Sequence, residues 1–87
     1  MMDANLNLYK YFIAVMDERS ITRAAHKLGV SQPTVTYNIK ELEKHLQHKL
    51  FVVGKHGVCP EPRAITLYHR IKPAYQSLLA IIDEFTG

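Results

Sequence analysis

The residues with the clearest chemistry lie between positions 31 and 46, where one face of the segment is polar at its start and cationic further along, a distribution suited to DNA base edges first and phosphates after. Taken alone, this pattern would favour an ordinary amphipathic surface helix. Gln32 and Pro33 come first, and Thr36 and Tyr37 follow one helical turn later. Glutamine can form two hydrogen bonds with adenine, a hydroxyl group can donate or accept, and a proline ring or threonine methyl can contact a thymine methyl. We predict that these four side chains contact bases. The alternatives are an ordinary polar helix start for Gln32 and a sugar or phosphate contact for Tyr37.

A second set of side chains has the types that bind phosphate groups. Hydroxyl groups near a helix N-terminus combine with the helix dipole, and lysine and arginine add full charges. The residues predicted to contact the DNA backbone are Ser20, Thr22, Arg23, Ser31, Thr34 and Lys40. Lys44 is a weaker candidate than Lys40. Glu41 and Glu43 could instead pair with these lysines on a solvated face, and Arg23 could be an ordinary surface residue.

The base-reading set needs a helix over residues 31–46 to present it. Ser31 is suited to cap the N-terminus of this helix, and Pro33 lies in the first turn, where a missing N–H costs little. The apolar residues recur every three or four positions and form one stripe, opposite the polar face, that must be buried. They are Val35, Ile39, Leu42 and Leu46.

A shorter helix is predicted just before it, over residues 20–28. Ser20 can cap this helix, and its buried positions are Ile21, Ala24, Ala25 and Leu28. Buried alanines allow another helix to approach closely and cross at a steep angle. Gly29 can end the helix in the left-handed conformation, and Val30 is an apolar plug in the turn that follows. This order of capped helix, glycine turn and capped helix is typical of a DNA-binding helix-turn-helix.

A first helix is predicted at the N-terminal end, where Asn5 can cap it. Its predicted buried residues are Leu6, Tyr9, Phe12, Ile13 and Met16, and its predicted solvated residues are Lys10, Asp17 and Glu18. The spacing is helical, and we expect this element to be mainly scaffold.

A two-stranded wing is predicted after residue 46. The run 50–53 is β-prone, residues 54–57 form a turn, and Val58 and Cys59 return before Pro60 ends the strand. Lys55 and His56 then lie at the tip of the wing. An irregular loop is the alternative.

A long C-terminal helix is predicted to begin at Glu61 and Pro62, because an acidic residue and a proline both favour the first turn. Its apolar residues alternate spacings of three and four, which indicates a heptad seam. The seam consists of Tyr68, Ile71, Tyr75, Leu78, Ile82 and Phe85. Pro73 should kink this helix or open its hydrogen-bond ladder. Since the small N-terminal core cannot cover the whole seam, we expect it to join two copies of the chain.

Length and composition limit the alternatives. The chain has 87 residues, 47% of them hydrophobic, which suits one small globular unit. A net charge of +3 permits a polyanionic partner without requiring one. The single cysteine, Cys59, excludes an internal disulfide and is expected to be a small apolar filler. The five histidines are expected on the surface or wing, without the spacing of a metal site. No apolar segment is long enough to span a bilayer, so we expect a soluble protein, cytoplasmic if bacterial.

The stretch SITRAAHKLGVSQPTVTYNIKELEKHLQHKLF closely resembles the N-terminal DNA-binding domain of LysR-type transcriptional regulators. It follows the family pattern S-x-T-x-A-A-x-x-L-x-x-S-Q-P-x-x-(S/T)-x-x-I-x-x-L-E-x-x-L-x-x-x-L-F, and the resemblance extends from about Leu6 through the wing. The chain departs from the family at Tyr37, where arginine is common, and at Val53, where a basic residue is frequent. It departs again over residues 60–64, where L-T-x-A-G is usual.

The resemblance implies a mainly α fold with two parts. Residues 1–60 would form a winged helix-turn-helix with a three-helix core, and residues 61–87 a linker helix that pairs antiparallel in a homodimer. A full-length regulator of this kind could also form a tetramer. Family members continue into an effector-binding domain, so we expect either a piece of a longer regulator or an unusually short protein.

Two classes of function remain after these observations. The first is sequence-specific binding of double-stranded DNA at an inverted-repeat operator, as the DNA-binding domain of a dimeric bacterial transcriptional regulator. The second is a winged-helix module that binds another protein. The sequence lacks a nucleophile–base constellation, a glycine-rich phosphate loop and metal-ligand spacing, so we expect neither an enzyme nor a cofactor or small-molecule site.

Overall fold

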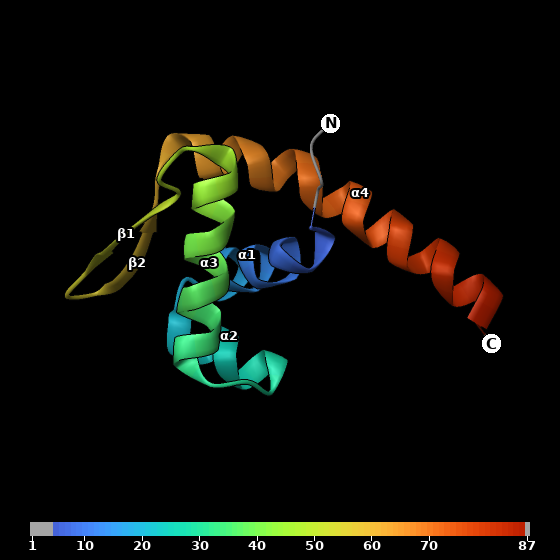
Figure 1. Cartoon of the computed structure of the whole chain (residues 1–87), viewed down its shortest axis with the longest axis horizontal. Coiled ribbons are helices and arrows are strands. Elements are labelled where there is room, and N and C mark those ends of the chain that lie inside the picture. The colour runs from blue at the N-terminus through green and yellow to red at the C-terminus, as the bar shows by residue number, and fades with distance from the viewer. Residues whose placement is uncertain (1–4, 87) are drawn as a thin grey trace.

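The computed structural model describes residues 5–86, and these form four helices and a two-stranded antiparallel sheet. In chain order the elements are α1 (Leu6–Glu18), α2 (Ile21–Leu28), α3 (Gln32–Leu46), β1 (Phe51–Gly54), β2 (Gly57–Pro60) and α4 (Pro62–Thr86). Figure 1 shows α1, α2 and α3 packed together, with the wing on one side and α4 running past the end of α3, on the side away from α2, and leaving on the other. This is the predicted winged helix-turn-helix with a long C-terminal helix. Residues 1–4 and 87, which the two expected ranges include, lie outside the described residues.

Side-chain caps determine where the first three helices begin. Asn5, Ser20 and Ser31 each accept a hydrogen bond from a backbone N–H in the first turn, over 3.0, 3.1 and 3.3 Å. Gly29 ends α2 with φ at 68°. Glycine adopts this left-handed conformation without a steric penalty. The predicted caps and the glycine turn are therefore confirmed.

The hydrophobic core lies where α1, α2 and α3 meet the wing and the first turns of α4. Its largest fully buried side chains are Phe12, Val15, Val35, Leu42 and Leu50. Phe12 contacts Phe51 of β1, with the ring centroids 5.8 Å apart. Ala24 and Ala25 are also buried, so that little side-chain bulk lies between α2 and its neighbours.

The face of α1 that enters the core differs from the prediction. The buried residues are Leu8, Tyr11, Phe12, Ala14, Val15 and Met16. Of the predicted set, Leu6 is exposed, and Tyr9 and Ile13 are only partly buried. Apolar residues lie on more than one side of α1, so helical periodicity alone could not select the face that packs.

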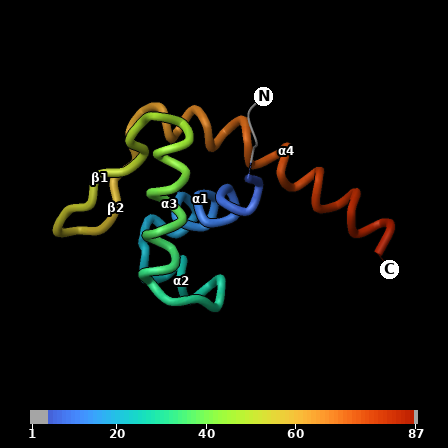
Figure 2. The backbone as a smooth tube through the Cα atoms, in the orientation of Figure 1, coloured from blue at the N-terminus to red at the C-terminus, as the bar shows by residue number. Residues whose placement is uncertain are grey.

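The wing forms as predicted, with Phe51 opposite Pro60, Val52 opposite Cys59 and Val53 opposite Val58. The tube in Figure 2 shows the two strands meeting in a tight turn, which Lys55 and His56 occupy. Cys59 is exposed, so the prediction of an apolar filler is wrong. Side chains alternate between the two faces of a strand, and Val58 takes the buried position beside it.

Only the first part of α4 packs against the helical core. Ala64 is buried, and Leu67, Tyr68 and Ile71 are partly buried against the core. The predicted seam is therefore divided, since Tyr68 and Ile71 contact their own chain. Further along, the exposed apolar residues are Leu78, Leu79, Ile81, Ile82 and Phe85. The helix continues through Pro73, and its axis descends more steeply in the second half (Figures 1 and 2). Among residues 5–86, no helix has both the length and the apolar character needed to cross a membrane.

A polar cluster joins α4 to α1 and α2. We call it the Asp17 cluster, and it consists of Asp17, Lys27, Tyr68 and Lys72. Oδ1 of Asp17 accepts hydrogen bonds from the Tyr68 hydroxyl and, over 2.8 Å, from Nζ of Lys72. Nζ of Lys72 also donates to the Tyr68 oxygen over 2.9 Å, and Nζ of Lys27 lies 3.5 Å from Oδ2 of Asp17. The Asp17 side chain is only 19% exposed, so its predicted solvated position is wrong.

The contacts of the Asp17 cluster favour the ionised forms of its charged groups. Burial alone would raise the pKa of Asp17, but hydrogen bonds from Lys72 and Tyr68 and the charges of Lys72 and Lys27 together lower it below its usual value. The hydrogen bonds to Asp17 and Tyr68 raise the pKa of Lys72. Both groups therefore carry their charges at neutral pH.

The contribution of Asp17 to the free energy of unfolding should depend on pH. A carboxyl group with a folded-state pKa below its unfolded value of about 3.9 stabilises the fold above that pH, and this stabilisation is lost as the pH falls through the folded-state pKa. The free energy of unfolding of Asp17→Asn should therefore be lower near neutral pH and fall less steeply below about pH 4. Urea denaturation over a pH series measures both effects. Asp83→Asn, at an exposed carboxyl group in α4, is the control. If the free energy of unfolding of Asp17→Asn fell below about pH 4 as steeply as that of the unaltered chain, the stabilising role of ionised Asp17 would be contradicted.

Candidate nucleic-acid interface

The four residues predicted to contact bases lie together on the first two turns of α3. Gln32 and Pro33 are exposed, Tyr37 is 62% exposed, and Thr36 is half-buried. The side of α3 opposite Pro33 and Tyr37 is held in the core by Val35, Ile39 and Leu42, and Leu46 is partly buried beside them. The predicted buried stripe is confirmed, and the face that remains in solvent is polar.

Five of the six residues predicted to contact phosphates, all except Lys40, lie at the N-termini of α2 and α3. Ser20 already accepts a bond from the backbone of Arg23, which leaves its own O–H free to donate. The hydroxyl groups of Ser31 and Thr34 lie 2.9 Å apart, so one of them donates to the other. One O–H of this pair therefore remains for a ligand. Thr22 is exposed on the first turn of α2.

Arg23 has a neighbour that competes with a phosphate. Its side chain is 75% exposed, and its Nε lies 3.5 Å from Oε1 of Glu18 in α1. Exposed ion pairs of this kind contribute about 1 kcal/mol or less. Arg23 can therefore leave Glu18 for a phosphate at little cost.

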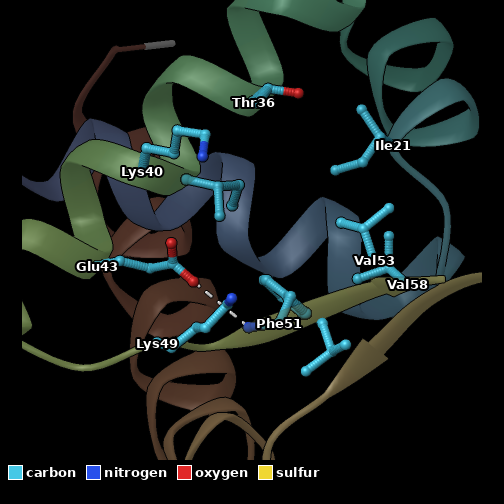
Figure 3. A pocket seen from close by; sticks show the side chains of 10 residues that line it. Ile21, Thr36, Lys40, Glu43, Lys49, Phe51, Val53 and Val58 are labelled. Carbon is cyan, nitrogen blue, oxygen red and sulfur yellow. Dashed lines mark hydrogen bonds between the residues drawn. The ribbon is translucent and has the colours of Figure 1, made fainter.

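A groove of about 280 Å³ lies between α3 and the wing, and we call it the wing groove. Figure 3 shows the side chains that line it, with Thr36, Lys40 and Glu43 from α3, Phe51, Val53 and Val58 from the wing, Ile21 from α2, and Lys49. Most of its wall is apolar, and two ammonium groups, those of Lys40 and Lys49, belong to the same wall. The groove thus combines an apolar surface with positive charge.

Lys49 is a candidate residue that the sequence analysis missed. It lies in the connection between α3 and β1 and is exposed. Because this connection has no helical or strand periodicity, nothing in the local sequence relates Lys49 to Lys40. The two lysines come to line one groove only because the chain turns back after α3.

Glu43 has a different role from the pairing with lysine that was considered as an alternative. Its Oε2 accepts hydrogen bonds from the backbone N–H groups of Leu50, over 2.7 Å, and Phe51, over 3.4 Å. Figure 3 shows the bond to Phe51 spanning from α3 to the first residue of β1. Glu43 therefore attaches the wing to α3 at one edge of the wing groove.

The remaining polar candidates lie on the surface. Lys55 and His56 are exposed at the tip of the wing, and the other four histidines are exposed as well. Within residues 5–86, no group of three or more histidine, cysteine, aspartate or glutamate residues is arranged to hold a metal ion.

A comparison with family models matches residues 6–64 to one described as a bacterial regulatory helix-turn-helix protein of the lysR family. The transcriptional regulator LeuO of Escherichia coli (strain K12) is 43% identical over 72 residues, covering 83% of this chain and 23% of LeuO. CysL of Bacillus subtilis (strain 168) is 41% identical over 66 residues, covering 76% of this chain and 22% of CysL. The chain spans about a quarter of the length of the curated relatives that it matches.

Solved structures share the same architecture. A complex of the BenM DNA-binding domain with catB site 1 DNA has a TM-score of 0.80 and 27% identity, covering 97% of this chain and 99% of that chain. A probable transcriptional regulator from Pseudomonas aeruginosa has a TM-score of 0.89 and 25% identity, covering 97% of this chain and 28% of that chain.

Replacing Glu43 with alanine should weaken the attachment of the wing to α3. The change removes the acceptor of the partly buried Leu50 N–H, and an unsatisfied buried donor costs about 1–3 kcal/mol. Urea denaturation should show this loss, and amide hydrogen exchange at Leu50 and Phe51 should accelerate. Glu41→Ala, two residues earlier in α3, is the matched control. Equal losses in both variants, or unchanged exchange in Glu43→Ala, would show that the contact does not hold the wing.

Proposed function

The chain belongs to the LysR family of bacterial helix-turn-helix regulators, and from this premise we propose that it is the DNA-binding part of a cytoplasmic transcriptional regulator. It binds double-stranded DNA sequence-specifically, with α3 in the major groove. The observation that carries the proposal is the capped α2–α3 pair, which buries one stripe of α3 and leaves the polar face of its first two turns in solvent. A further support is the BenM DNA-binding domain, which is similar to 97% of this chain and was solved in complex with DNA.

Base recognition is assigned to the N-terminal half of α3. Gln32 and Thr36 carry the hydrogen-bonding groups, and the ring of Pro33 offers an apolar surface to a thymine methyl. Tyr37 is exposed far enough to reach either a base edge or the backbone. Its phenol has one O–H, so it cannot form two parallel hydrogen bonds with guanine as arginine does.

Backbone recognition is assigned to the helix N-termini and the wing groove. Ser20, Thr22 and Arg23 face phosphates from α2, and Ser31 and Thr34 do so from α3. One sugar–phosphate strand follows the wing groove, where its phosphates meet the two lysines and its deoxyribose rings meet the valines. Lys55 and His56 then extend the contact toward the flanking minor groove.

The exposed half of α4 provides the surface for a homodimer. Five large apolar side chains between Leu78 and Phe85 are 37–85% exposed, and a second copy of the same helix, packed antiparallel, would cover them. In this arrangement residues 1–60 read DNA and residues 61–87 join the two copies. A two-fold dimer requires an inverted-repeat site with half-sites about 34 Å apart, or a multiple of that distance.

The two kinds of DNA contact should respond differently to mutation. Gln32→Ala should cost about 1–3 kcal/mol, mainly on the preferred site. Lys40→Ala and Lys49→Ala should each weaken binding to every duplex and reduce the salt slope by roughly one unit, because each removes one phosphate contact. Titration of cognate and scrambled duplexes over a salt series measures both effects. Lys10→Ala, on α1, is the matched control for the loss of charge. Equal weakening on both duplexes by Gln32→Ala would refute the base-reading assignment, and association without salt dependence would favour a protein partner.

Charges placed in the exposed seam should split the dimer. Leu78→Glu with Ile82→Glu would bury unpaired carboxylates at the contact, which is strongly unfavourable. Gln76→Glu with Ala80→Glu adds the same charge on the opposite side of α4, by helical periodicity, and is the control. Sedimentation should show a monomer only for the seam variant, which should still bind a single half-site. An unaltered chain that stays monomeric at micromolar concentration and binds one half-site as tightly as a repeat would overturn the dimer.

A further inference from the structure

The Asp17 cluster lies where α4 leaves the helical core. The residues of α4 that pack on the core are Ala64, Leu67, Tyr68 and Ile71, and the cluster holds the helix at Tyr68 and Lys72. From Leu78 onward, the large apolar side chains of α4 are exposed. The cluster is therefore at the end of the docked part of the helix, next to the part that extends away.

Pro73 follows Lys72 directly and weakens the helix at this point. Proline has no backbone N–H, so the carbonyl of His69 lacks its usual helical hydrogen bond. A helix with a missing bond resists bending less than a continuous one. The direction of the following residues thus depends on how firmly the turn before Pro73 is held.

The cluster can hold that turn in one orientation because its contacts are directional. Apolar packing at Leu67 and Ile71 allows small rotations, since burial has little dependence on angle. Tyr68 and Lys72 both donate to a single oxygen of Asp17. A rotation of α4 would weaken these hydrogen bonds, because their strength depends on distance and angle. Lys27 adds a contact from α2, so the same carboxylate links α4 to both α1 and α2.

A small change in direction at Lys72 has a large effect at the end of α4. The 14 residues that follow Lys72, up to Thr86, extend over about 21 Å at 1.5 Å per residue. A tilt of about 10° at the start moves the end by roughly 4 Å, which is close to the rise of one base pair. The separation of two recognition helices in a dimer joined through this segment depends on the same angle.

We propose that the Asp17 cluster is a specificity-determining joint: it sets the direction in which α4 leaves the helix-turn-helix and, through the dimer, the half-site spacing that the protein accepts. Tyr68 and Lys72 are the positioning residues, and Asp17 is the group that they bind. The claim about helix direction stands on contacts within one chain. The claim about spacing rests on the dimeric function proposed above.

The direction of α4 can be measured within one chain by spin labelling. Cys59 is the only cysteine in the sequence and is exposed on the wing, and Ala80→Cys adds a second site on the side of α4 away from the seam. Mixing the labelled chain with an excess of unlabelled chain leaves only the distance between two labels in the same chain. Pulsed dipolar spectroscopy should then show one narrow distance population in the unaltered background.

Two substitutions test the joint in this background. Lys72→Met keeps an unbranched side chain but removes the charge, and Tyr68→Phe removes only the hydroxyl group. Each should broaden the distance distribution, by about twofold for Lys72→Met. Lys72→Arg can still donate to Asp17 and should restore the narrow distribution. Arg70→Met, on an exposed residue of the same turn, should leave it unchanged. A narrow, unshifted distribution in both Lys72→Met and Tyr68→Phe would overturn the proposal.

Binding to repeats of different spacing tests the second half of the claim. The unaltered chain should prefer one spacing, and Lys72→Met should reduce that preference by roughly three- to tenfold while changing binding to a lone half-site by less than about twofold. If Lys72→Met weakened binding to all duplexes equally, the Asp17 cluster would have a merely structural role and the proposal would be refuted. If the unaltered chain showed a narrow distribution of label distances but no preference for one half-site spacing, the proposed dimer would be refuted. The proposed role of the cluster in setting the helix direction would still stand.

Discussion

Burial of one stripe of α3 is the interaction on which the rest of the structure depends. Val35, Ile39 and Leu42 are held by the helical core, and this orients the helix so that Gln32 and Tyr37 face solvent. The buried alanines of α2 make this arrangement compact, because they allow helices to cross without large side chains between them. The proposed DNA-reading surface is therefore the polar side of a helix whose other side is a large part of the core.

Two carboxylates connect the outer elements to this core. Glu43 accepts bonds from the start of β1, and Asp17 accepts bonds from α4. Glu43 joins two successive elements, whereas Asp17 joins elements far apart in the chain. Both use hydrogen bonds where apolar packing alone would leave the angle free. In the proposed dimer that spans two half-sites, the wing and α4 would need defined directions. Glu43 and Asp17 would then orient these elements as well as stabilise the fold.

Much of this architecture follows from the sequence alone, because it rests on interactions between near neighbours. A serine that caps its own helix, a glycine that ends one and a stripe with a period of 3.6 residues are local properties, so the sequence determined α2, the turn and α3 almost to the residue. The wing followed from β-prone residues around a glycine turn. The exposure of Pro33 and Tyr37 could be predicted for the same reason, since they lie opposite the buried stripe, and that of Gln32 could be predicted because it is the first residue of the helix.

The tertiary structure decided what depends on residues far apart in the chain. It selected the face of α1 that packs, where apolar residues on several sides left the choice open. It also placed Lys49 beside Lys40 in the wing groove and turned Asp17 from an expected surface residue into the partner of Tyr68 and Lys72. Periodicity describes one element at a time, whereas these contacts join residues that meet only after α3 has ended and the chain has turned back across the core.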